Sequence, residues 1–274
     1  MSRLEDTYTH GHAESVLRSH RWRTAENSAG YLLPHLRPGQ HLLDVGCGPG
    51  TITIDLAARV APGRVIGIDR AVQPLGQARA AARAAAVDAG VHTPTFEVGD
   101  VYALDLADAS VDVVHAHQVL QHLTDPVAAL REMARVCRPG GVIAARDADY
   151  AAFTWWPADP RLDGWLDLYR ACARDNNAEP DAGRRLLAWA HAAGLADTTA
   201  SAGVWCYATP ADRAWWGGMW ADRIVESALA DQAVSSGRAS RDDLQEMRLA
   251  WQEWAVADDG WFMVPHGEIL ARPH

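Results

Sequence analysis

Apolar residues between positions 41 and 150 come in short runs that alternate with longer segments of helical periodicity. Short apolar runs bounded by turn residues are typical of buried strands, whereas apolar residues three and four positions apart are typical of one helix face. The runs predict strands at 41–45, 64–68, 95–98, 111–116 and 142–146, and the segments between them predict helices near 50–60, 74–89 and 126–137. Such alternation favours a parallel, doubly wound sheet.

The pattern changes on both sides of this region. Residues 8–36 carry apolar positions at helical spacing until Arg37-Pro38-Gly39 interrupts them, so we expect a helical lead-in. After residue 150 the sequence predicts Trp-rich helices, a strand, a further helical stretch and a final strand, at 159–176, 181–193, 198–208, 210–256 and 261–270. We expect the 210–256 helices to be inserted between the last two strands as a lid.

These elements define the expected fold. It is an α/β fold with a doubly wound, mostly parallel seven-stranded sheet, N-terminal helices and a Trp-rich helical lid before the last strand. We divide the chain into a lead-in at 1–38, a cofactor-binding core at 39–150 and a C-terminal part at 151–274 that completes the sheet, with the cap at about 210–256.

A glycine-rich turn follows the first predicted strand, in the run Leu42-Leu43-Asp44-Val45-Gly46-Cys47-Gly48-Pro49-Gly50. Glycines let the backbone approach a ligand where a Cβ would obstruct it, and Asp69 ends the next strand, where it can accept hydrogen bonds from ribose hydroxyls. A dinucleotide fingerprint needs Gly or Ala where this chain has Thr51. The spacing therefore favours S-adenosylmethionine over a nicotinamide cofactor.

Several polar residues lie at the carboxyl ends of the predicted strands. Ligands of doubly wound sheets bind at these ends. Gly46, Asp69, Asp100 and His117 all occur at or just past them, and their convergence predicts one ligand site.

Composition narrows the classes of function. The chain has 274 residues, a net charge of -10 and no lysine among its 25 basic residues, so Schiff-base chemistry, a pyridoxal phosphate anchor and a P-loop are excluded and nucleic acid is not an expected partner. No apolar stretch approaches the roughly 20 residues of a bilayer span. We therefore expect a soluble, cytoplasmic protein without membrane insertion. The four cysteines form no C-x-x-C pair, and we expect neither a metal site nor disulfides.

Four segments in order resemble class I S-adenosylmethionine-dependent methyltransferases of the ubiquinone/menaquinone-biosynthesis type, which include many small-molecule methyltransferases. The resemblance covers about residues 8–150 and rests on 42–50, 65–69, 98–100 and 111–126, followed by Arg135-Val136-Cys137-Arg138-Pro139-Gly140-Gly141. The family members that methylate nucleobase or peptide amino groups carry Asn or Asp and then Pro-Pro after the fourth strand, where this chain has His115-Ala116-His117-Gln118. Methylation of nucleic acid is thus further disfavoured.

The resemblance implies roles for individual residues. Gly46, Cys47 and Gly48 would admit the methionine part of the cofactor, and Asp69 would bind both ribose hydroxyls. Arg70 would flank the adenine, Asp100 would accept from its amine, and Val101 would pack on its ring. The remaining cofactor contacts would be His117 beside the sulfonium and Arg23, with Tyr8 nearby, at the carboxylate.

The substrate side is less defined by the sequence. His122 is a candidate general base because histidine titrates near neutral pH, although a structural role stays open. Eleven of the 12 tryptophans follow residue 150, so Trp155, Trp216 and Trp220 are candidates for lining an aromatic or terpenoid-like substrate or, alternatively, for core packing.

We therefore expect methyl transfer to an O, C or N nucleophile of a small, hydrophobic or aromatic molecule. A nicotinamide-dependent oxidoreductase and a non-catalytic S-adenosylmethionine-binding module are the alternatives. The sequence leaves open the acceptor, the use of a general base, and whether the protein is a monomer or a homodimer.

Overall fold

The computed structural model describes residues 6–9, 20–89 and 93–273. A mixed sheet of eight strands forms its centre: β1 (Leu42–Val45), β2 (Val65–Asp69), β3 (Thr95–Val98), β4 (Val111–His117), β5 (Cys137–Ala148), β6 (Thr154–Trp156), β7 (Asp197–Tyr207) and β8 (Trp261–Arg272). The order along the sheet is β3-β2-β1-β4-β5-β8-β6, and β7 also pairs with β8.

The first five strands are parallel, and β8 runs antiparallel to β5, β6 and β7. The predicted doubly wound α/β fold is thereby confirmed, with one more strand than expected. The added strand β6 has three residues and pairs Trp155 with Phe262 of β8. A run this short carries too few residues for a recognisable alternation of apolar and polar positions.

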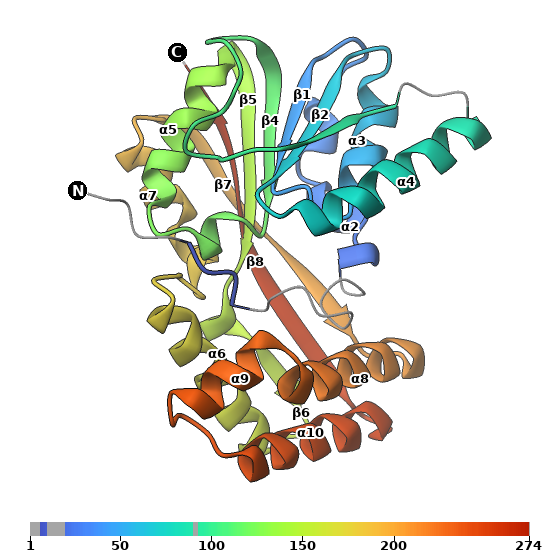
Figure 1. Ribbon diagram of the computed structural model, residues 1–274, viewed down its shortest axis with the longest axis vertical. Coiled ribbons are helices and arrows are strands. Elements are labelled where there is room, and N and C mark those ends of the chain that lie inside the picture. The colour runs from blue at the N-terminus through green and yellow to red at the C-terminus, as the bar shows by residue number, and fades with distance from the viewer. Residues whose placement is uncertain (1–5, 10–19, 90–92, 274) are drawn as a thin grey trace.

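Helices cover both faces of the sheet. The described helices are α2 (Ala25–Ala29), α3 (Thr51–Val60), α4 (Val72–Ala89), α5 (Pro126–Val136), α6 (Pro160–Asp175), α7 (Leu186–Ala192), α8 (Pro210–Glu226), α9 (Ala228–Ser235) and α10 (Arg241–Val256). In Figure 1, α2, α3 and α4 lie on one face of the parallel strands, and α5 and α7 lie on the other.

The lead-in, expected to be helical at 8–36, is divided into short pieces. Within the described residues it contains helical backbone at His20 and Arg21, then α2 and a 3-10 turn at Leu33–His35, and residues 10–19 lie outside the described residues. Thr24 caps α2 through a capping box with Asn27, which makes the helix begin anew at this point. The turn contains Pro34, which cannot donate a backbone hydrogen bond.

The segment at 210–256 lies between β7 and β8, as predicted, and contains three helices. Ser227 separates α8 from α9, and Ser240 begins α10 with a capping box to Asp243. These helices gather around β6 and the adjoining end of β8, at the opposite end of the molecule from the amino ends of the parallel strands (Figure 1). The predicted lid thus covers the end of the sheet where the glycine turn lies.

Two kinds of core hold these layers together. Aliphatic residues of the parallel strands pack under α3 and α5. The lid has an aromatic core instead, in which the rings of Trp220 and Trp251 lie 4.5 and 4.8 Å from that of Trp165. Buried aromatic rings supply large apolar areas, so this cluster fixes the lid against β8.

Candidate active site

A cavity of about 420 Å³ lies at the carboxyl ends of the parallel strands. Its walls come from the glycine turn after β1, the ends of β2 and β4, the strand β7 and the lid helix α8. Ligands of doubly wound sheets bind at this place. The cavity therefore joins the predicted cofactor residues to the tryptophan-rich part of the chain.

The glycine turn leaves no room for side chains at two positions. Gly46 has φ +66°, and a Cβ there would lie 2.4 Å from Cγ2 of Val119. Gly50 has φ +80°, and a Cβ there would lie 2.8 Å from Cζ of Phe96. Both positions need glycine because their φ values lie in the left-handed region and because their neighbours fill the space.

Asp69 connects the end of β2 to this turn. Its carboxylate accepts hydrogen bonds from the backbone N–H groups of Gly48, at 3.0 Å, and Ala71, at 2.8 Å. Cys47, beside Gly48, also lines the cavity, and burial raises the pKa of its thiol, which stays protonated. The turn and the acidic residue are thus held as one unit facing the cavity.

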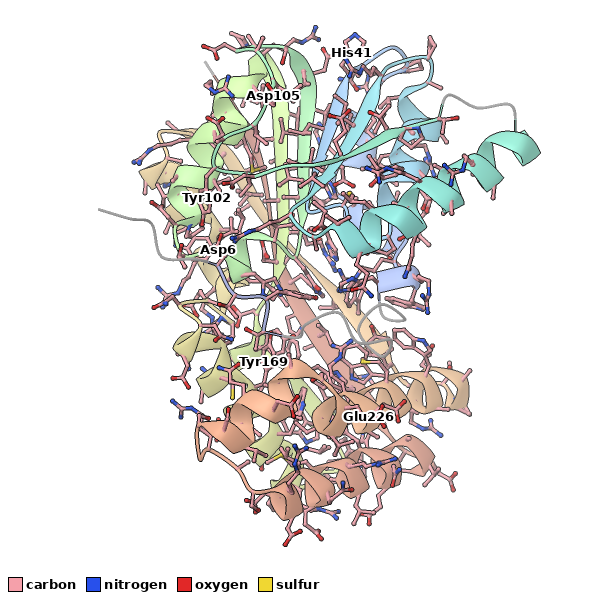
Figure 2. All side chains as sticks on the ribbon, viewed as in Figure 1. Asp6, His41, Tyr102, Asp105, Tyr169 and Glu226 are labelled. Atoms are coloured by element: carbon pink, nitrogen blue, oxygen red, sulfur yellow. The ribbon has the colours of Figure 1, made fainter. Side chains whose placement is uncertain are left out.

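The predicted adenine contacts lie at the outer part of the same cavity. Asp100 is exposed, and its carboxylate accepts a hydrogen bond of 2.9 Å from the backbone of Tyr102. Val101 is buried beside it, and Arg70 is exposed and lies 3.4 Å from the carbonyl of Asp6. Figure 2 shows Asp6 and Tyr102 close together at this edge, where the Tyr102 hydroxyl donates to the Asp6 carboxylate.

Arg23 brings a positive charge into the cavity. Its Nη2 donates to Oε1 of Gln118 at 2.6 Å, and its guanidinium carbon lies 5.7 Å from the ring centroid of Trp205. Burial lowers the pKa of Arg23 to about 10, so the group stays charged at neutral pH. The Tyr8 hydroxyl hydrogen-bonds to His20 at 3.1 Å, and burial raises its pKa to about 12, which keeps it protonated.

His122 follows β4 in a 3-10 turn at Leu120–His122, called η2. Its ring meets that of Tyr8 edge-on, with 4.8 Å between centroids. Gln121 accepts from the N–H of Ala148 through Oε1, so its amide nitrogen donates to Nε2 of His122 at 3.0 Å. Burial and the charge of Arg23 lower the pKa of His122 to about 3, and the ring is therefore neutral at physiological pH.

His117 ends β4 and is 5% exposed. Within the described residues neither of its ring nitrogens has a hydrogen-bond partner. Burial, together with Arg23 and Arg146, lowers the pKa of His117 well below its ordinary value. A neutral imidazole with two unsatisfied nitrogens therefore faces the cavity, which it lines.

The three predicted substrate residues have different surroundings. Trp216 and Trp220 of α8 both line the cavity, and the ring of Trp216 stacks on Tyr207 at 4.3 Å. Trp155 is not among the residues lining the cavity. Its ring stacks on Phe262 at 5.5 Å because the pairing of β6 with β8 turns it into the aromatic core.

Metal sites were not expected, and within the part of the chain that the structure describes no cluster of three or more His, Cys, Asp and Glu side chains could hold a metal ion. Among the described helices, none has the length and apolar character needed to cross a bilayer.

Comparison with known proteins decides the family. The methyltransferase domain family matches residues 36–199 of the chain. The chain belongs to this family. It is a class I S-adenosylmethionine-dependent methyltransferase, and this assignment decides against the nicotinamide-dependent oxidoreductase.

Two relatives match the methyltransferase over almost its whole length. An uncharacterized methyltransferase of Schizosaccharomyces pombe is 34% identical, with 97% of this chain and 96% of that protein covered. A protein of Aspergillus luteorubrus named "Probable methyltransferase ltbC" is 30% identical, with 97% of both covered. The solved YcgJ protein of Bacillus subtilis has the same fold, with a TM-score of 0.53, 21% identity and coverage of 89% of this chain and 97% of that one.

The cavity of the methyltransferase has the chemistry that S-adenosylmethionine needs. The turn at Gly46 and Gly50 admits backbone contact because a Cβ would collide there. Asp69 supplies acceptors for hydroxyl groups, and Arg23 is a buried cation whose Nε has no partner within the described residues. A carboxylate is the usual partner of such a guanidinium.

The methyltransferase cavity also contains residues that sequence reasoning missed. Gln118 and Trp205 contact Arg23, and Asp44 accepts from Thr53 and contacts His115 at 2.7 Å. Asp44 could have been found from the sequence, because it lies inside the glycine-rich run at residues 42–50. Arg223 is 4% exposed, three residues after Trp220, and its guanidinium carbon lies 4.7 Å from that ring. An arginine in a helix is usually solvated, so its helical spacing gave no indication of this position.

Proposed function

We propose that this enzyme transfers the methyl group of S-adenosylmethionine to an O, C or N nucleophile of a small hydrophobic or aromatic molecule. One observation carries the proposal: a single cavity is bounded by the glycine turn and Asp69 on one side and by Trp216 and Trp220 of the lid on the other. Cofactor chemistry and an aromatic acceptor site thus meet in one space.

The proposed cofactor contacts follow the position of each residue in the cavity. Gly46, Cys47 and Gly48 admit the methionine part, and Asp69 binds the ribose hydroxyls. Further out, Asp100 accepts from the adenine amine, Val101 packs on the ring and Arg70 flanks it. The carboxylate is held by Arg23 with Tyr8 beside it, and His117 borders the sulfonium region.

The proposed acceptor site is the aromatic part of the cavity. Trp205, Tyr207, Trp216 and Trp220 contribute large flat aromatic surfaces, which suit a planar or terpenoid-like molecule. The ubiquinone/menaquinone-type motifs of residues 8–150 make quinone-like compounds the first acceptors to test. Trp155 supports this wall from behind, through Phe262.

For this reaction the main contribution of the protein is to position the two reactants. When bound, S-adenosylmethionine supplies a methyl group already activated by a sulfonium. The chain's own residues orient the acceptor and exclude water, which supplies most of the catalysis in reactions of this kind. His122 is the proposed base for acceptors that must lose a proton, and it can take that proton on Nε2 only when the hydrogen bond from Gln121 opens.

A labelled methyl donor tests the proposal. The protein is incubated with it and with a library of quinone-like, other aromatic and terpenoid acceptors, and the labelled product is identified. We expect label in a small apolar product. Binding of S-adenosylmethionine without transfer to any acceptor would favour the non-catalytic module instead.

Location and assembly stay predictions. We propose a cytoplasmic enzyme, which cell fractionation tests. The sequence left monomer and homodimer open, and light scattering of the purified protein distinguishes them.

A further inference from the structure

Gln118, directly after β4, has an unusual backbone conformation. Its φ is +54°, a left-handed value that residues other than glycine rarely adopt. Its N–H donates to the carbonyl of Arg146 at 2.7 Å, and its side chain lies between Arg23 and His266. Non-glycine residues keep such conformations where their surroundings over-determine them, which often happens at ligand sites.

The direction of the hydrogen bonds around Gln118 can be worked out from His266 of β8. This histidine is 1% exposed, and its Nδ1 lies 3.0 Å from the carbonyl oxygen of Val264. A carbonyl only accepts, so Nδ1 carries the proton. Burial and the charges of Arg146 and Arg23 hold the pKa of His266 well below its ordinary value, so the ring is neutral and Nε2 is an acceptor.

This tautomer fixes the amide of Gln118. The Gln118 Nε2 lies 2.9 Å from Nε2 of His266 and must donate to it. The amide oxygen therefore points the other way and accepts from Nη2 of Arg23 at 2.6 Å. In each of these three hydrogen bonds a donor meets an acceptor. Arg23 donates to Gln118, Gln118 donates to His266, and His266 donates to the carbonyl of Val264.

Trp205 closes the same group of residues from the side. Its ring centroid lies 4.4 Å from that of His266 and 5.7 Å from the guanidinium carbon of Arg23. Trp205 is 6% exposed, and its ring packs beside both Arg23 and His266.

We propose that Gln118 and His266 are positioning residues that aim the guanidinium of Arg23 into the cofactor part of the cavity. We call Val264, His266 and Gln118 the Gln118 relay. If His266 loses its acceptor nitrogen, the Gln118 amide is free to turn and present its N–H groups to Arg23, a donor facing a donor. The inference rests on the proposed function insofar as Arg23 binds the cofactor carboxylate.

The first test needs no ligand. Nitrogen-15 NMR of histidine-labelled protein reports the tautomer of His266. We expect the neutral Nδ1–H form between pH 5 and 8, and a changed Nε2 shift in Gln118→Leu, which removes the donor. An Nε2–H or charged ring at His266 would overturn the relay, whether or not the protein binds S-adenosylmethionine.

The second test is a double-substitution cycle read by calorimetry with S-adenosylhomocysteine. Gln118→Leu removes the acceptor of Arg23, and His266→Phe removes the acceptor that holds the Gln118 amide, so each should weaken binding by about tenfold or more. Because both substitutions act through Arg23, the double variant should bind S-adenosylhomocysteine as tightly as the single variant with the lower affinity. The proposal would be contradicted if the affinity losses of the two single variants multiplied in the double variant, or if the single variants bound as tightly as the parent protein.

Controls separate this outcome from others. His191→Phe changes an exposed histidine outside the cavity and should bind normally. If His266→Phe does not fold, Gln118→Leu and the NMR measurement still decide, since Gln118 is half-buried. A parent protein that gives no binding heat refutes the proposed function, whereas normal binding in Gln118→Leu refutes the relay alone.

Discussion

At the scale of single residues, the cofactor end of the cavity depends on a few contacts that involve the backbone. Asp69 accepts from two N–H groups of the turn and also lines the cavity, where we propose that it binds the ribose hydroxyls. Val119 packs so closely against Gly46 that a Cβ at position 46 would collide with it. Substitutions at these positions therefore have defined consequences.

Asp69→Asn should weaken S-adenosylhomocysteine binding. The variant keeps the shape but loses the charge and one of the two oxygens that accept from Gly48 and Ala71. A charged acceptor contributes about 1.5 to 3 kcal/mol, so we expect a loss of about 10-fold to 100-fold in calorimetry. Asp105→Asn is the matched control, because Asp105 is exposed and lies away from the cavity, near the other end of the sheet (Figure 2). Equal affinities for Asp69→Asn and the parent protein would remove Asp69 from the site.

Gly46→Ala should lower both the thermal stability and the cofactor affinity. Its Cβ would lie 2.4 Å from Cγ2 of Val119, in a backbone region that costs alanine about 1 kcal/mol or more. Adding Val119→Ala removes that methyl group and should restore part of the melting temperature, leaving the backbone cost. If the second substitution restores nothing, the collision is not the cause.

His122→Ala should lower turnover for a hydroxyl acceptor by no more than about 100-fold, the low end of what a general base contributes, because a pKa of about 3 makes a weak base. The affinity for S-adenosylhomocysteine should stay within about twofold. With a pKa of about 3, His122 stays neutral as the pH falls through its ordinary range, so the turnover of the parent enzyme should not decline between pH 7 and 5. A normal rate in His122→Ala excludes the base. A fall in parent turnover with a midpoint near pH 6.5 contradicts the lowered pKa.

At the scale of elements, the sequence predicted those strands and turns that the local pattern of apolar residues and glycines determines. The strands from β1 to β5 and the glycine turn followed from apolar runs and from Gly46 to Gly50. Local pattern did not show β6, whose Trp155 is placed by a partner about 100 residues away. It also missed Gln118 and Arg223, because their positions in the cavity depend on packing between distant elements.

The lid has its own stabilising contacts at helix starts. Ser240 accepts from the N–H of Asp243 at the beginning of α10. Replacing such a cap by alanine typically costs about 1 kcal/mol, so Ser240→Ala should lower the free energy of unfolding by about that amount. Ser235→Ala at the end of α9 is the control and should cost less. Equal losses in urea denaturation would show that the cap is not responsible.

At the scale of the whole molecule, β8 joins the two halves. It pairs with β5 from the core and with β6 and β7 beside the lid. It brings Val264 into the cavity wall and places His266 against Gln118. The division of the chain at residues 38 and 150 stays a prediction, since this one strand is bonded to strands on both sides of residue 150.

Asp147 of β5 makes the stability of the molecule depend on pH. It is fully buried, and burial raises its pKa to about 8 although it accepts a hydrogen bond of 3.1 Å from the N–H of Gln121. The folded state thus binds this proton more tightly than the unfolded chain, so the stability it contributes is fully present below about pH 4 and is lost as the pH rises through 8. Between pH 5 and 9 the parent protein should lose stability relative to Asp147→Asn in urea denaturation. A constant difference would contradict a raised pKa.

Calorimetric titration of the parent protein with S-adenosylmethionine tests the central claim most directly, with Asp69→Asn titrated in parallel. The account predicts a saturable heat for one site in the parent protein and a binding constant weakened at least about tenfold in Asp69→Asn. The absence of heat in the parent protein, or the same affinity in both proteins, would contradict the assignment of the cavity to this cofactor.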